Sequence, residues 1–237
     1  MVGMNQKQSV LKNALRYAGV RTQPDPVLAG RLDALYEKAL ASSRFRITLL
    51  EDCVDSIEPD LPADKPGIRL QRTGLFLPGS LAKRMLSGSQ SVTLLGCTLG
   101  QGFDAALYRM QMLNMADALL FDAIGSALIE ECLDQWQSEY VKKKQPLFPS
   151  DRFSAGYGDL PLGVQKEMAQ VLKLPANIGV YLSDSLMMNP TKSVTALLGF
   201  FEDEQPARIR GCQYCSFQKR CLHCRPESGE QSVSVQN

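Results

Sequence analysis

The 237-residue sequence predicts an α+β fold from the order of its expected elements. Helix-like and strand-like segments follow one another in mixed rather than strictly alternating order, and their connections vary in length. This arrangement favours α+β over a doubly wound parallel sheet. No G-x-G-x-x-G motif follows a strand and no P-loop motif is present, so a nucleotide-binding parallel sheet is not indicated.

The first half of the chain combines amphipathic helices with short strands. Apolar residues recur at spacings of three and four in the second helix, and β-branched residues with partial alternation favour the first strand. "SVTLLGCTLG", which ends at Gly100, indicates a short buried strand closed by glycine. The expected elements before it are helices at 6–19, 26–42 and 80–87, and strands at 45–57 and 67–73.

The second half is expected to begin with a long helical tract at 101–142. Lys142 to Lys144 suit the negative end of its dipole. Gly125 inside the tract costs about 1 kcal/mol relative to alanine, so we expect close packing there. A loop at 145–162, a helix at 163–173 and strands at 178–183 and 193–201 complete the expected order.

The glycine-containing segment "TLGQG" at 98–102 ends a strand and opens a helix. It has two interpretations. A helix N-terminus can hold an anion, whereas the same residues also suit a simple strand-to-helix turn.

Composition and charge are ordinary for a globular protein. Apolar residues make up 44% of the chain, and 26 basic residues against 25 acidic ones give a net charge of +1. This balance carries no signature of nucleic-acid or membrane binding. The N-terminus lacks the apolar core of a secretory signal, and four of the seven cysteines crowd near the C-terminus rather than forming a distributed framework. We therefore expect a cytoplasmic protein.

The segment "DRFSAGYGDLPLG" at 151–163 gathers residues with special backbone or binding chemistry. Gly156 and Gly158 permit a positive φ or a close approach of the backbone to a ligand, with Tyr157 between them. Arg152 offers a bidentate fork for a carboxylate, and Asp159 can accept hydrogen bonds from backbone amides or a ligand amine. The segment predicts either a binding loop for a small zwitterion with a flat base or a solvated surface loop.

"RFSAGYGDLPLGVQKEM" at 152–168 and "IGVYLSDSLMMNPTKSVTALLGFF" at 178–201 resemble the activation (AdoMet-binding) domain of cobalamin-dependent methionine synthase. The sequence is more closely similar to the short proteins that carry this domain alone. Shorter blocks extend the resemblance over most of residues 10–200: "ALRYAGV", "LFLPGS", "CTLG" and "ADALLFDAIGSALIE". The resemblance implies a single C-shaped domain over residues 1–205, with a bent antiparallel sheet and flanking helices.

In that family the signature Arg-x-x-Pro-Gly-Tyr holds S-adenosylmethionine (AdoMet) through its backbone and its arginine. Three residues match the signature, and alanine stands where proline is usual, which relaxes the fixed φ of the turn. The implied AdoMet-binding residues are Arg152, Ala155, Gly156, Tyr157, Gly158 and Asp159.

Other segments contribute further candidates. The family also grips the ligand with acidic residues, for which Asp122 and Glu130 are the candidates here. The second block lies beside the AdoMet groove in the family, which makes Ser185 and Lys192 contact candidates. Met187 and Met188 in that block are expected to be core residues or an adaptable apolar wall.

The activity that the resemblance implies is reductive methylation. Inert cob(II)alamin recovers when it receives one electron, from a donor such as a flavodoxin or ferredoxin, and a methyl group from AdoMet. Because 237 residues leave no room for the barrels and cobalamin module of a full methionine synthase, the partner is expected to be a separate corrinoid protein or methionine synthase. Tyr157 is the candidate catalytic residue, since its ring or hydroxyl can face the sulfonium.

A cysteine array follows this domain at 206–225, and a polar tail expected to be disordered occupies 226–237. The C-x2-C-x5-C-x2-C spacing suits four thiolates around Zn²⁺ or an iron–sulfur cluster. His223 is a substitute ligand or a solvated bystander, and four free thiols are the alternative to a metal site. Three other cysteines, Cys53, Cys97 and Cys132, are expected in the core. The predicted ligands are Cys212, Cys215, Cys221 and Cys224.

Two other functions are alternatives to the reactivation of a corrinoid protein. One is a metal-stapled adaptor that docks on a corrinoid protein without catalysis. The other is an AdoMet-dependent methyltransferase of another kind, which the lack of a strand-associated G-x-G-x-x-G motif disfavours.

Overall fold

The computed structural model describes residues 4–20, 22–56 and 67–206. These residues form an α+β fold in which all paired strands are antiparallel. The α+β prediction is therefore confirmed. The cysteine array predicted at 206–225 and the tail lie outside the described residues apart from Pro206.

The described residues contain seven helices and nine strands. The helices are α1 (Met4–Tyr17), α2 (Pro26–Ser42), α3 (Ser80–Leu86), α4 (Gln101–Leu113), α5 (Met115–Lys144), α6 (Val164–Val171) and α7 (Leu174–Ile178). The strands are β1 (Arg46–Asp52), β2 (Val54–Ser56), β3 (Gly67–Leu70), β4 (Phe76–Pro78), β5 (Ser91–Thr98), β6 (Phe148–Pro149), β7 (Tyr181–Leu182), β8 (Met188–Asn189) and β9 (Ser193–Phe201).

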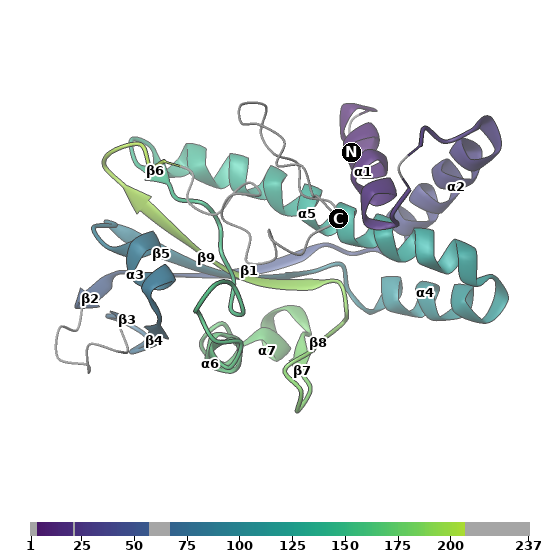
Figure 1. Cartoon of the computed structure of the whole chain (residues 1–237). Helices are drawn as coiled ribbons and strands as arrows, with labels where there is room; N and C mark the ends of the chain where they lie inside the picture. The colour runs from purple at the N-terminus through teal and green to yellow at the C-terminus, as the bar shows by residue number, and fades with distance from the viewer. Residues whose placement is uncertain (1–3, 21, 57–66, 207–237) are drawn as a thin grey trace, which may run out of the picture.

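A four-stranded sheet with the order β1-β5-β9-β6 occupies the centre of the fold. Smaller sheets, β2-β3-β4 and β7-β8, are attached to it. Figure 1 shows α5 running along one face of the central sheet, with α6 and α7 on the other face. The helices α1 and α2 pack on α5 near its first half.

The central strands are buried on both faces, which explains their nearly continuous apolar sequence. Alternate residues of β5 enter different cores: Leu95 packs in the core under α5, whereas Leu94 packs against α3, α6 and α7. On β9, Ala196 and Leu197 divide in the same way. The sheet therefore separates two apolar cores.

The helical tract expected at 101–142 is two helices, so the prediction of one continuous tract is wrong. The chain leaves the helical conformation at Asn114, which has φ −154° and ψ 101°. Its side-chain oxygen accepts hydrogen bonds from the backbone amides of Ala116 and Asp117, and thus caps α5. The apolar periodicity continues across the break because α4 and α5 bury the same core.

Two strand predictions also need correction. The strand expected at 45–57 ends at Asp52, and β2 begins at Val54 in a different sheet. The segment expected to be a strand at 178–183 contains the end of α7 and only two strand residues, because Gly179 adopts φ 70° and terminates the helix.

Asp52 explains why the chain changes direction after β1. Its buried carboxylate accepts hydrogen bonds from the backbone amides of Cys53, Arg72 and Thr73 and from the Thr73 hydroxyl. Burial alone would raise the pKa of Asp52, but these bonds outweigh it and lower the pKa below 3.8. The carboxylate thereby links the end of β1 to the turn between β3 and β4 (Gly67–Leu70 and Phe76–Pro78).

We expect Asp52→Asn to lower the free energy of unfolding by about 1–3 kcal/mol at pH 7, because an amide nitrogen would oppose a backbone donor. A lowered pKa stabilises the fold above the unfolded pKa, and this stabilisation is lost as pH falls through the folded pKa. The difference between the two proteins should therefore shrink below about pH 4 in urea-unfolding measurements. A difference that does not change with pH would contradict this role.

No helix within the described ranges is long and apolar enough to cross a membrane.

Candidate functional site

One face of α5 carries the polar side chains of the candidate site. Asp122, Ser126, Glu130 and Asp134 recur every four residues, so they lie above one another on the same side of the helix. Ala123, Ile124 and Ala127, which lie between these positions, are buried in the core below. This amphipathic pattern leaves a row of carboxylates facing away from the core.

A cavity of about 520 Å³ opens between this face of α5, the end of α1 and the chain that leads into β9. It falls in the range typical of small-molecule clefts. Its lining residues are Tyr17, Leu119, Asp122, Ala123, Ser126, Ile129, Glu130, Thr191, Lys192, Ser193 and Val194.

Lys192 supplies the positive charge in the cavity. Its ammonium group lies 2.8 Å from a carboxylate oxygen of Asp122 and donates to the Ser126 hydroxyl at 2.9 Å. The neighbouring Thr191 is tied to α4, since its amide and hydroxyl both donate to Asp104 at 2.8 Å. The chain entering β9 is therefore held firmly against both helices.

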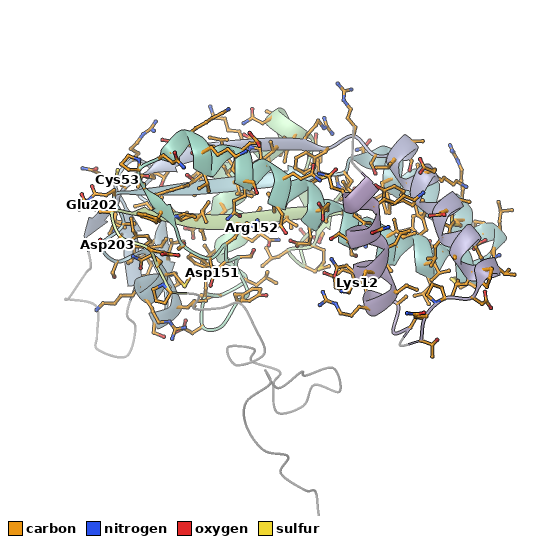
Figure 2. The ribbon with its side chains drawn as sticks, turned by 90° about the horizontal axis from the view of Figure 1, so that it is seen from above. Lys12, Cys53, Asp151, Arg152, Glu202 and Asp203 are labelled. Carbon is orange, nitrogen blue, oxygen red and sulfur yellow. The ribbon has the colours of Figure 1, made fainter. Side chains whose placement is uncertain are left out.

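Arg152, labelled in Figure 2, is linked to the cavity through its ion pair with Glu130 of α5, which lines the cavity. Its guanidinium donates to Glu130 at 3.1 Å and to Asp134 at 2.9 Å, and it also bonds to Gln137. Only 12% of its side chain is exposed. The next residue, Phe153, is buried and exchanges two backbone hydrogen bonds with Leu197 of β9, which fixes the position of Arg152.

The loop after Phe153 has the glycine conformations that its sequence predicts. Gly156 and Gly158 have φ values of 87° and 55°. The Tyr157 amide donates to the Ser154 carbonyl and the Gly156 amide to the Leu160 carbonyl, which closes a tight turn. Tyr157 is 54% exposed at the tip of this turn. Ala155, where the family has proline, is buried beside it.

Asp159 faces α3. Its carboxylate accepts hydrogen bonds from the amide and hydroxyl of Ser80, both at 2.6 Å, and from the amide of Leu81 at 2.9 Å. Burial would raise the pKa of Asp159, but these bonds lower it below its ordinary value. A Cβ on Gly79 would lie 2.8 Å from Asp159, so only glycine allows this approach. The sequence predicted backbone amides or a ligand amine as partners of Asp159. Among the described residues, its partners include two backbone amides.

The structure brings together several candidates that are distant in sequence. Asp122, Glu130 and Lys192 line one cavity, and Arg152 joins them through Glu130. Ser185 is not among them, because its hydroxyl bonds to Ser183 in the turn between β7 and β8.

Other sequence candidates have structural positions outside the cavity. Met187 in the same turn is 66% exposed, and Met188 is half-buried beside the core formed with α3, α6 and α7. "TLGQG" forms a turn in which a Cβ on Gly102 would lie 2.5 Å from the Ser42 carbonyl oxygen. This close carbonyl is unfavourable for an anion, so the structure supports the turn interpretation.

Sequence reasoning missed Tyr17, Leu119 and Ser126 as lining residues. Ser126 stands four residues from both Asp122 and Glu130, so its helical spacing was an available signal. Tyr17 and Leu119 carried no such signal, since each looks like an ordinary residue of an amphipathic helix. Their proximity depends on the packing of α1 against α5.

The three remaining cysteines are free. Cys97 is fully buried, as expected, and burial raises the pKa of its thiol to about 12. Cys132 is half-buried against the core under α5, and Cys53 is also half-buried, so these two are less buried than expected. Within the described ranges, no group of three or more histidine, cysteine or acidic residues is placed to hold a metal ion. The four predicted metal ligands lie outside those ranges.

A second cavity of about 410 Å³ lies between α6, α7 and β7. Its walls are largely apolar, and its charged lining residues are Lys166 and Lys173. It contains no carboxylate to receive a ligand amine. The first cavity, with charges of both signs, is therefore the better candidate for a zwitterion.

Comparisons with known proteins identify the fold. No protein-family model and no curated protein matches the sequence. Among solved structures, the MetH reactivation domain bound to AdoHcy matches over 87% of this chain and 81% of that chain, with a TM-score of 0.53 and 14% sequence identity. The chain therefore has the fold of the MetH reactivation domain, as its sequence blocks at 152–168 and 178–201 predict.

Proposed function

We propose that this protein binds AdoMet in the cavity beside α5 and supports reductive methylation of cob(II)alamin on a separate corrinoid protein. The observation that carries the proposal is the combination of opposite charges in one cavity of this fold. Lys192 suits a ligand carboxylate, and the carboxylates of Asp122 and Glu130 suit the hydroxyl and ammonium groups of the ligand. The MetH reactivation domain with the same fold binds AdoHcy, the product that AdoMet leaves after methyl transfer.

Arg152 adds to the amino-acid end of this site. Its position is determined by the Phe153–Leu197 backbone pairing and by two carboxylates, so little side-chain entropy remains to be lost on binding. When AdoMet arrives, its ammonium group can share Glu130, which leaves a guanidinium edge available for the ligand carboxylate. Positioning of this kind is the main task of the protein, because the cobalt centre of the partner supplies the reactive electron pair.

In the proposed reaction, a reductase supplies one electron and AdoMet supplies the methyl group. One electron converts cob(II)alamin to cob(I)alamin, whose electron pair takes the methyl group from the sulfonium. The carbon–sulfur bond breaks, its electron pair stays on sulfur, and AdoHcy is released. A flavodoxin or ferredoxin is the proposed class of electron donor.

A partner must approach the open side of the cavity to receive the methyl group. Exposed apolar side chains gather where α4 turns into α5, and Leu119 belongs both to this group and to the cavity wall. Such a surface is typical of protein association. The exposed residues are Tyr108, Met112, Leu113, Met115 and Leu119.

The test of the proposal has two stages. Calorimetric titration should first detect AdoMet binding to the purified protein. Single-turnover absorption measurements with a cob(II)alamin protein and a one-electron donor should then show methylcobalamin only when this protein and AdoMet are both present. Association with the cobalamin protein without AdoMet binding or methylation would instead support the adaptor function.

Tyr157→Phe separates binding from catalysis. If the exposed hydroxyl orients the ligand or the corrin, the variant should bind AdoMet with less than a twofold change and form methylcobalamin about tenfold more slowly. Tyr181→Phe, at a tyrosine with 57% exposure on the β7 strand, is the matched control. Equal single-turnover rates for Tyr157→Phe and the wild type would remove the hydroxyl from the mechanism.

We further propose that Cys212, Cys215, Cys221 and Cys224 bind one metal centre through four thiolates. The support is their C-x2-C-x5-C-x2-C spacing. Metal analysis and an absorption spectrum of anaerobically purified protein should give either stoichiometric zinc without colour or a brown iron–sulfur protein. Neither metal at stoichiometric level, or metal that remains after replacement of all four cysteines by serine, would contradict the site.

A further inference from the structure

The cavity beside α5 has two chemically different ends. Glu130 and the adjoining Arg152 form a charged end, with Asp122 and Lys192 between this end and the opposite one. The opposite end along α5 is lined by the Leu119 side chain, and Tyr17 from α1 also lines the cavity. At about 1.5 Å of rise per residue, Leu119 and Glu130 lie roughly 16 Å apart along α5. The cavity is therefore long and polarised along the helix axis.

Tyr17 and Leu119 are well suited to receive a flat apolar group. Their exposures are 47% and 60%, so both present apolar surface that a ligand can cover. Tyr17 is the last residue of α1, which packs along α5, and the Arg16 guanidinium lies 5.1 Å from its ring centroid. This cation–π contact restrains a ring that lines the cavity.

We infer that Tyr17 and Leu119 bind the adenine base of the ligand, with the amino-acid group directed toward Glu130 and Arg152. The inference rests on the proposed AdoMet site and adds its orientation. A base stacked on an aromatic ring gains about 1–3 kcal/mol. The reverse orientation would place the charged amino-acid group against the Leu119 end and the flat base among four charged side chains.

The order of residues along α5 supports the same orientation. Asp122 lies one turn after Leu119, where its carboxylate can accept hydrogen bonds from ribose hydroxyls next to the base. Ser126 and Lys192 follow, and Glu130 lies two turns beyond Asp122. The base thus meets an apolar surface, the ribose an acidic one and the amino-acid group one with charges of both signs. This is the order in which the three groups are joined in AdoMet.

Calorimetric titration of Tyr17→Ala with AdoHcy, adenosine and methionine tests the orientation. AdoHcy is the main probe because it is chemically stable. We expect the affinity for AdoHcy and adenosine to fall about tenfold, which corresponds to about 1.4 kcal/mol. Methionine affinity should change less than twofold, because methionine lacks the base. Tyr17→Phe should retain at least half of the wild-type affinity, since it keeps the ring.

Two further variants make the test specific. Leu119→Ala should repeat the ligand pattern of Tyr17→Ala, whereas Tyr181→Ala, which removes an exposed tyrosine outside the cavity lining, should bind all three ligands as the wild type does. Thermal unfolding confirms that each variant is folded. Wild-type affinity of Tyr17→Ala for AdoHcy, or an equal loss for methionine, would overturn the orientation alone. A wild-type protein that binds neither AdoMet nor AdoHcy would overturn the proposed function as well.

Discussion

Arg152→Ala should weaken AdoMet binding by about 1.5–3 kcal/mol, or roughly 10- to 150-fold in the dissociation constant. The change removes a charge-assisted hydrogen bond to the ligand carboxylate. It also leaves Glu130 and Asp134 without the cation that lies 3.1 and 2.9 Å from them, so the charged end of the cavity becomes more negative. Isothermal titration of the folded variant measures the effect.

Arg152→Lys and Lys142→Ala are the matched variants. Lysine at 152 keeps the charge but lacks the planar fork, so an intermediate loss is expected. Lys142→Ala removes an exposed ion pair with Glu139 on the same helix and should leave affinity and stability nearly unchanged. Unchanged AdoMet affinity in a folded Arg152→Ala protein would remove this arginine from the binding site.

Gly125→Ala should lower the free energy of unfolding by about 2–3 kcal/mol, although alanine is normally the better helix former by about 1 kcal/mol. An added Cβ would overlap the Phe103 ring, with the two Cε atoms at 2.7 and 2.8 Å. The ring has little room to move, because Phe103 is fully buried and stacks on Phe121 at 4.6 Å. The cost of overpacking therefore outweighs the gain in helix propensity.

Gly30→Ala provides the control for this reasoning. Gly30 lies inside α2, and an added Cβ there would meet no atom within 4 Å. Alanine should therefore stabilise the protein by about 0.5–1 kcal/mol. Urea unfolding of both variants should show opposite changes in the free energy of unfolding. Stabilisation by Gly125→Ala would show that α4 and α5 pack less closely than the contact between Gly125 and the Phe103 ring implies.

Local sequence patterns predicted much of the fold correctly. Apolar spacing of three and four gave α2 its observed bounds, and the continuous apolar run before Gly100 predicted the doubly buried strand β5. The same signal could not locate the break at Asn114, because residues on both sides bury one core. Periodicity reports which face is buried, whereas the break depends on a capping side chain.

The sequence by itself determined which residues have the right chemistry for the site. It indicated the glycine conformations at 156 and 158 and the fork of Arg152 from the residues, and Asp122 and Glu130 from the resemblance. The first two properties follow from single residues, which are local.

Only the tertiary structure decided which of these residues meet. Antiparallel pairing of β9 with β5 carries Lys192 to the acidic face of α5, where it lies 2.8 Å from Asp122. Packing of α1 on α5 brings Tyr17 into the cavity that Leu119 also lines, and a hydrogen-bonded turn directs Asp159 toward Ser80. Such contacts join segments 70 to about 100 residues apart, and their formation depends on burial of the shared apolar cores, to which distant parts of the chain contribute together.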